Sequence, residues 1–180
     1  SATTDGTKSV NVNYGSAMPS ITLPKRTGYT FGGFYTSTSG SGTKYYNANG
    51  SSARTYTLTS TTTLYAYWTK DTYTITYNNN GGTINTTPTT SYQYGNSVTL
   101  PDDVTRDGCT FGGWFDNANC EGGAVTTIPS SSTGNKTFYA KWTPNTYVVR
   151  LHPGEGTIQS GNVTSYTYGV GAILPSASSM

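Results

Sequence analysis

The feature that most constrains this chain is an internal repeat. The segment Gly28–Tyr35 returns at Gly108–Phe115, and both copies carry Gly-x-Thr-Phe-Gly-Gly followed by two aromatic residues. The segment Leu64–Thr69 returns in the same way at Phe138–Thr143. Blocks that recur in the same order indicate tandem modules, each of which depends on its neighbours to bury a core.

The order of the blocks predicts three modules. Residues 1–70 form a first module that lacks its first strand, residues 71–144 a complete second module, and residues 145–180 the N-terminal hairpin of a third. Incomplete modules at both ends are expected either in a piece of a longer or processed product or in a subunit whose two ends complement each other. The links at 69–72 and 143–146 are short, so we expect a semi-rigid array in which each module contacts mainly its neighbours.

Composition and periodicity predict a mainly β fold, α+β at most, with little or no helix. Hydrophobic residues make up only 33% of the chain, below the roughly 45–50% of an ordinary domain. Aromatic residues must therefore supply much of each core. Tyr73, Ile75 and Tyr77 alternate with threonines, which is the pattern of a half-buried strand. Turn residues and a second strand around Ser91–Leu100 complete a hairpin.

The Gly-Gly pair in each Phe-Gly-Gly block predicts a β-bulge between two large aromatic side chains. Trp114 is then either a core residue beside the bulge or an exposed platform for a carbohydrate, and burial is the commoner fate of tryptophan. The residues predicted to form the aromatic cores are Phe31, Phe34, Trp68, Phe111, Trp114 and Trp142.

The ordered blocks resemble the Listeria-Bacteroides repeat, also called the internalin B-repeat. They are Tyr-x-Ile-x-Tyr with a following Asn-Gly-Gly, then Tyr-Gly, Leu-Pro, Gly-x-Thr-Phe-Gly-Gly-Trp and Phe-Tyr-Ala-Lys-Trp. The resemblance covers essentially the whole chain. It implies small β-grasp-like modules in microbial surface proteins, often stalks, with no general catalytic site. The chain departs from the pattern at Cys109, which replaces an aromatic residue, and in its incomplete third copy.

The two cysteines, Cys109 and Cys120, predict a disulfide and therefore an oxidising compartment. A zinc site needs about four protein ligands, and the chain offers one histidine, His152, which lies in another module. We expect His152 to be an exposed loop residue. No base adjoins either thiol, so a cysteine nucleophile is not indicated.

The acidic residues do not have the spacing of a calcium loop, and we expect them to be solvated. They are Asp102, Asp103, Asp107 and Asp116. An isopeptide bond from Lys141, with Glu121 or Asp116 as the acid, stays open. We predict no metal, no cofactor and no enzymatic activity, because no paired carboxylates, triad or phosphate loop can be assembled.

The formal net charge is +2 and the basic residues are scattered, which argues against nucleic acid as a partner. No apolar run is long enough for membrane insertion. Four Asn-x-Ser/Thr motifs are possible glycosylation sites of an extracellular chain, at Asn49, Asn85, Asn135 and Asn162.

Three functions remain open. The leading hypothesis is a stalk or fibre-forming segment of a cell-surface protein or adhesin, whose partners are neighbouring modules. The second is a subunit of a filament, in which the C-terminal hairpin completes module one of an identical subunit by strand addition. The third is an adhesive module that binds a host or cell-surface glycan or protein through Tyr45, Tyr46 and Tyr92–Tyr94.

Overall fold

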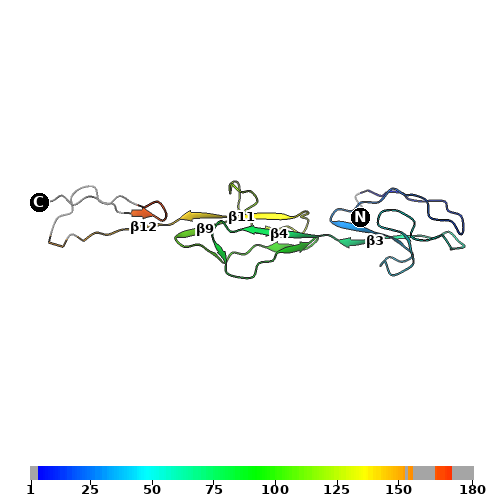
Figure 1. Ribbon diagram of the computed structural model, residues 1–180, viewed down its shortest axis with the longest axis horizontal. Helices are drawn as coiled ribbons and strands as arrows, with labels where there is room; N and C mark the ends of the chain where they lie inside the picture. Colours follow the sequence, from blue (N-terminus) through cyan, green and yellow to red (C-terminus); the bar gives the residue numbers. More distant parts are fainter. Residues whose placement is uncertain (1–3, 153, 156–164, 172–180) are drawn as a thin grey trace. The chain divides into compact units, whose positions relative to one another are not determined.

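The computed structural model describes residues 4–152, 154–155 and 165–171. Within these residues the chain forms strands and turns and no helix, so the predicted mainly β fold class is confirmed, in its all-β form (Figure 1). The same residues hold no helix long and apolar enough to span a membrane.

The strands of the described residues are short. They are β1 (Tyr29–Tyr35), β2 (Lys44–Tyr46), β3 (Tyr65–Lys70), β4 (Thr72–Asn78), β5 (Thr83–Ile84), β6 (Ser91–Gln93), β7 (Val98–Thr99), β8 (Val104–Thr105), β9 (Cys109–Phe115), β10 (Thr127–Ile128), β11 (Lys136–Pro144), β12 (Thr146–Val148) and β13 (Ser165–Thr167).

The first module contains a three-stranded antiparallel sheet in the order β2-β1-β3. The register between β1 and β3 shifts between Phe31 and Gly33, which places a bulge at the predicted Gly-Gly pair. Gly33 has φ +125°, and a Cβ there would overlap the carbonyl oxygen of Tyr46. Glycine is therefore required at position 33 by both backbone conformation and space.

The second module contains a four-stranded mixed sheet in the order β6-β4-β11-β9. The central strands β4 and β11 are parallel, and Ile75 lies opposite Lys136. The outer strands are antiparallel to them, with Tyr92 opposite Tyr73 and Trp114 opposite Ala140. The bulge recurs in β9. Phe111 pairs with Trp142 and Trp114 with Ala140, so β9 has one residue more than β11 between these two pairs.

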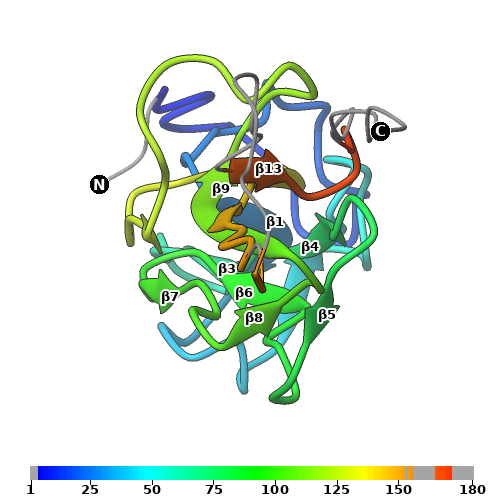
Figure 2. The same ribbon diagram turned by 90° about the vertical axis from the view of Figure 1, so that its left-hand side faces the viewer.

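The second strand predicted around Ser91–Leu100 is two strands with different partners. β6 pairs with β4 as expected, whereas β7 pairs with β10. Two further ribbons join β5 to β8 and β12 to β13, and Figure 2 shows β5 and β8 side by side. The Tyr94-Gly95 turn divides the predicted strand, since Gly95 has φ +92°.

Module one reproduces the ribbon of β5 and β8 only as a single bridge. Thr4 lies opposite Lys25, as Thr83 lies opposite Thr105 in module two. Residues 4–28 contain no strand, and in the part of module one that the structure describes the sheet has no counterpart of β4 or β6. The sequence position equivalent to β4 falls before Ser1.

The cores are built from aromatic side chains with few aliphatic ones. In module one, Met18, Tyr45 and Tyr46 form a buried cluster, against which partly buried side chains such as Phe34 and Leu64 pack. In module two the largest buried side chain is Trp114, which is 2% exposed. Its indole N–H donates to the carbonyl of Pro101 at 2.7 Å, so burial leaves that donor satisfied.

The chain divides into two compact units. The first comprises residues 1–74, 91–97 and 129–135, and the second residues 75–90, 98–128 and 136–180. The start of module two, with its Tyr94 turn, therefore belongs to the same compact unit as module one.

Candidate functional site: the joints between modules

Each link between modules is a single residue outside the strands. Asp71 lies between β3 and β4, and Asn145 lies between β11 and β12. The conformation of these two residues therefore decides how the strand that ends one module leads into the strand that begins the next. Each joint, with all its contacts, lies within one compact unit.

In the first joint every polar group of Asp71 is engaged. Its backbone N–H donates to the carbonyl of Gly28 at 3.0 Å, and its carbonyl accepts from the N–H of Tyr94 at 2.9 Å. One carboxylate oxygen accepts from the hydroxyl of Thr30 at 2.6 Å and the other from the hydroxyl of Tyr73 at 3.3 Å. One residue thus ties the turn before β1 to the turn after β6.

The ring of Tyr94 lies directly against Gly28. Gly28 has φ +72°, and a Cβ at this position would overlap the Tyr94 ring. Tyr94 also meets Tyr29 edge-on, with ring centroids 5.6 Å apart, and the guanidinium of Arg26 lies 3.6 Å from the centroid of Tyr29. A side chain at position 28 would separate the two turns, so glycine is essential to the contact.

The second joint repeats the first, contact by contact. The N–H of Asn145 donates to the carbonyl of Gly108 at 2.8 Å, and the carbonyl of Asn145 accepts from the N–H of Tyr168 at 3.0 Å. The hydroxyl of Thr110 donates to Oδ1 of Asn145 at 2.6 Å, and Nδ2 donates to the hydroxyl of Tyr147 at 3.4 Å. Gly108 has φ +65°, and a Cβ there would overlap the Tyr168 ring.

The two joints differ in the side chains around this shared frame. Cys109 stands where the first joint has Tyr29, so Tyr168 has no edge-on aromatic partner among the described residues, and it is 44% exposed. Asn145 replaces the carboxylate of Asp71 by an amide. In the first joint, burial, followed by the charge and the hydrogen bond of Asp71, raises the pKa of Tyr73 above its usual 10.0.

Sequence reasoning found the repeated residues of the joints but not their contacts. Tyr94 and Tyr168 are members of the repeated Tyr-Gly pair, and Gly28 and Gly108 open the repeated aromatic block. The available signal was that Asp71 and Asn145 occupy the same place in two repeats and that both are short side chains with an acceptor oxygen.

The six aromatic residues expected in the cores lie in or beside them. Phe31 and Trp114 are buried, and the other four are half-buried: Phe34, Trp68, Phe111 and Trp142. They meet mostly edge-on, as in the pair Phe31 and Trp68, whose centroids are 5.3 Å apart. The exposed carbohydrate platform considered for Trp114 is therefore wrong.

The tyrosines considered as a binding surface are in large part interior. Tyr45, Tyr46 and Tyr92 are 1%, 2% and 4% exposed, and Tyr94 packs in the first joint. The hydroxyl of Tyr92 donates to the carbonyl of Gly134 at 2.6 Å. Burial raises the pKa of Tyr46 and, with a contribution from Tyr73, that of Tyr92. These rings have little area left to offer a glycan.

The structure corrects the predicted disulfide, because both thiols are free. Cys109 pairs across the sheet with Pro144, whereas Sγ of Cys120 lies 3.9 Å from the carbonyl oxygen of Ala140. Positions 140 and 144 are about 13 Å apart along an extended strand, beyond the roughly 7 Å that a disulfide allows between Cα atoms. The inference of an oxidising compartment loses this support.

The remaining polar candidates do not converge. His152 is exposed, and its Nδ1 accepts from the N–H of Gly154. Lys141 is exposed rather than buried and donates to the carbonyl of Cys120 at 3.2 Å, which does not suit an isopeptide bond. The acids Asp102, Asp103, Asp107 and Asp116 are all exposed. Among the described residues no group of three or more potential metal ligands occurs.

Three of the glycosylation candidates lie on the surface. Asn49, Asn85 and Asn135 are exposed. Nδ2 of Asn85 donates to Asp103 at 2.9 Å, and Oδ1 of Asn135 accepts from the N–H of Thr74 at 3.0 Å. The fourth, Asn162, lies outside the described residues. Glycosylation at these positions stays a prediction.

Comparison with known proteins agrees with the repeat. The chain matches the Listeria-Bacteroides repeat domain over residues 2–67 and again over residues 73–141. It is 34% identical to internalin H of Listeria monocytogenes over 76% of its own length and 23% of that protein. It is 28% identical to a putative membrane protein of Evansella cellulosilytica, over 87% of the chain and 22% of the relative.

A putative Gly-rich membrane protein of the same organism is also 28% identical, over 82% of the chain and 16% of its own length. The chain thus spans about a fifth of the length of the curated relatives it matches. No solved structure matches it. Two domain matches cover most of the described sequence, and the chain belongs to the Listeria-Bacteroides repeat family.

Proposed function

We propose that the chain is a non-catalytic spacer in the extracellular part of a microbial surface protein, where it holds another part of that protein away from the cell. The observation that supports this most strongly is the joint that occurs twice with the same hydrogen bonds, at Asp71 and at Asn145. A function that depends on repetition needs a contact that can be repeated.

The joints suit a spacer because every polar group of the linking residue Asp71 makes a hydrogen bond. To swivel about Asp71, a module must break its backbone bonds to Gly28 and Tyr94 and the side-chain bond from Thr30. Each such bond contributes a net of about 0.5–1.5 kcal/mol. Bending at a joint therefore costs several times the thermal energy, whereas a Gly/Ser-rich linker bends freely.

A catalytic role has little support in the described residues. The polar candidates considered above are all exposed, namely Asp102, Asp103, Asp107, Asp116, Lys141 and His152. The groups whose pKa is raised are tyrosines, and burial is the main cause of each shift. Structural burial explains those shifts without chemistry. The relatives named above, an internalin and two putative membrane proteins, support a location at the cell surface.

The adhesive alternative has weaker support than the spacer, because Tyr45, Tyr46 and Tyr92 are buried. Partner binding by other surfaces of these modules is compatible with a spacer role but is not indicated by any cavity with converging polar groups in the described residues.

The spacer proposal is tested by grafting the chain between a membrane anchor and a fluorescent reporter on a bacterial surface. Energy transfer from the reporter to a dye in the membrane measures the separation. The matched control is a Gly/Ser linker of equal length, whose ends average about 70–80 Å apart as a flexible coil. We expect less energy transfer with the native modules than with the flexible linker. Equal transfer would contradict the spacer role.

A further inference from the structure

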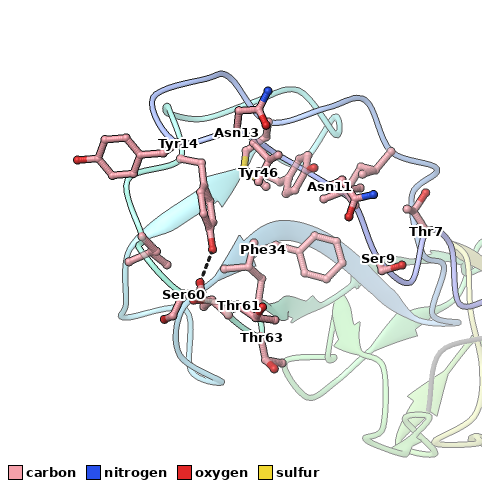
Figure 3. A pocket seen from close by; sticks show the side chains of 18 of the residues that line it. Thr7, Ser9, Asn11, Asn13, Tyr14, Phe34, Tyr46, Ser60, Thr61 and Thr63 are labelled. Atoms are coloured by element: carbon pink, nitrogen blue, oxygen red, sulfur yellow. Dashed lines mark hydrogen bonds between the residues drawn. The ribbon is translucent and has the colours of Figure 1, made fainter.

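An open groove of about 890 Å³ lies in module one (Figure 3). One wall is residues 7–14 and the other is residues 58–64, while Phe34 and Tyr46 lie between them. The groove is contained within one compact unit. Neither wall contains a residue of a named strand.

The walls of the groove correspond to the two strands that flank β4 in module two. Residues 11–13 are the repeat counterparts of β6, and residues 62–65 are the counterparts of the part of β11 that pairs with β4. Because module two has the order β6-β4-β11, the groove is the place where module one would hold a strand like β4.

The backbone in the middle of each wall is unpaired, although Thr7 and Asn13 near the ends of the first wall bond to Thr22 and Ser16. In the described part of the chain, neither residues 8–12 nor residues 61–64 make a backbone–backbone hydrogen bond. The indole N–H of Trp142 donates to the carbonyl of Asn79, just after β4, at 2.9 Å, whereas no such partner is described for the counterpart Trp68. Unpaired strand edges are a template for another strand.

The floor of the groove selects a strand with apolar side chains at alternate positions. In module two, Ile75 of β4 is 4% exposed, and the ring of Tyr77 lies 5.0 Å from Trp114 and 6.3 Å from Phe138. The counterparts of Trp114 and Phe138 in module one are Phe34 and Leu64, and both line the groove.

One further segment of the chain has the β4 pattern, and among the described residues no strand pairs with it as β11 pairs with β4. Residues 146–151 place Tyr147, Val149 and Leu151 where β4 has Tyr73, Ile75 and Tyr77. β12 pairs with β13 on one side only, and no partner is described on its other side. Tyr147 is 40% exposed and Leu151 43% exposed, both far more than Ile75.

We propose that the groove of module one accepts residues 146–151 of a second copy of the chain. The donated strand lies parallel to residues 62–64 and antiparallel to residues 11–13, in the register of β4, so that Arg150 lies opposite Thr63. Main-chain hydrogen bonds to both walls provide affinity, and the apolar side chains on the groove floor provide specificity. To be donated, the strand gives up its pairing with β13 in its own chain and pairs with residues 11–13 of the other copy. The loss is small, because an isolated two-stranded ribbon is at best marginally stable.

A contact of this kind is head-to-tail, because the donor and acceptor surfaces lie on different parts of the chain. Repetition of the contact gives an open filament unless the rotation closes a ring. The proposal stands apart from the spacer role, since it depends on the groove and the C-terminal strand rather than on the stiffness of the joints.

The first test is a cysteine cross-link between two single-cysteine proteins, both with Cys109 and Cys120 replaced by serine. One carries Thr63→Cys and the other Arg150→Cys. Neighbouring strands lie about 4.8 Å apart, within disulfide range. We expect a cross-linked dimer in the mixture at more than about ten times the yield of either protein alone. The matched control replaces Arg150→Cys by Val148→Cys, two residues out of register, and should cross-link at background level.

The second test is the size of the native chain by sedimentation velocity as a function of concentration. We expect concentration-dependent assembly that Val149→Asp weakens at least about tenfold, because it places a carboxylate on the groove floor. Val148→Asp, on the opposite face of the strand, should leave assembly unchanged. A monomer at every concentration, equal cross-linking of the out-of-register pair, or assembly unaffected by Val149→Asp would overturn the proposal.

The alternative to a second copy is that a strand of the same polypeptide fills the groove. A synthetic peptide with the sequence of residues 72–78 distinguishes this case. If the peptide binds the chain while copies neither assemble nor cross-link, the groove belongs to a strand of its own chain and donation between copies is refuted.

Discussion

The joint at Asp71 and the joint at Asn145 have the same backbone and different surroundings. In both, a tyrosine ring packs against a glycine of positive φ, and a short polar residue accepts a hydrogen bond from a threonine. The first joint adds the ring of Tyr29 and a carboxylate, and the second has Cys109 and an amide in their place. The comparison separates what the joint requires from what it tolerates, and the predictions below follow that division.

The largest effect is expected from a side chain at the glycine. Gly28→Ala should destabilise the joint by about 2–4 kcal/mol, because the new Cβ combines a strained φ with overlap of the Tyr94 ring. Chemical denaturation measures the loss. Gly123→Ala is the matched control, since no atom lies within 4 Å of a Cβ built there. Equal effects of the two substitutions would show that the Tyr94 contact is unimportant.

The next effect concerns the linking residue itself. Asp71→Ala removes the acceptor for Thr30 and Tyr73 and should cost about 1–2 kcal/mol. Asp71→Asn should recover most of that loss, because Asn145 makes the equivalent contacts in the second joint. The free energy of unfolding of both variants checks this. If asparagine behaves like alanine, the two joints are not equivalent.

A smaller effect is expected from making the second joint resemble the first. Cys109→Tyr should give Tyr168 the edge-on partner that Tyr29 gives Tyr94 and stabilise the joint by about 0.5–1.5 kcal/mol. Thermal unfolding at neutral pH measures the gain. A loss of stability would mean that the second joint has no room for the ring.

The smallest effect is expected at alkaline pH. Burial raises the pKa of Tyr77, and burial together with Asp71 raises that of Tyr73, above 10.0. Since the folded state favours the neutral phenol, this contribution is full below pH 10 and is lost as pH rises through the folded-state pKa. Unfolding at increasing pH should show the decline. Asp71→Asn should lower the pKa of Tyr73, measured by ultraviolet titration; an unchanged titration would argue against the Asp71 contact.

Much of the fold could be predicted because repetition reinforced weak signals. The alternation at Tyr73, Ile75 and Tyr77 gave a strand, and the Gly-Gly pair gave the bulge that the register of β9 contains. The parallel pairing of β4 with β11 could not be predicted, because periodicity identifies a strand but not its neighbour.

The sites were harder to predict than the fold. Cys109 and Cys120 are eleven positions apart in the sequence, but an extended strand separates them in space. The tyrosines were ambiguous for a related reason. A tyrosine suits both a surface and a core, and only the packing at Tyr45 and Tyr46 decides which. The contacts of Asp71 join residues that are distant in sequence, and no local pattern contains them.

The central claim is that the contacts of Asp71 restrict bending between the strand that ends module one and the strand that begins module two, both of which start within one compact unit. Spin labels at the exposed residues Ala48 and Ser131, introduced as the sole cysteines, report this directly through the distance distribution between them, because both residues lie in the compact unit that contains the first joint. The account predicts one narrow distribution that broadens in the Gly28→Ala variant. A distribution that is equally broad in both proteins would contradict it.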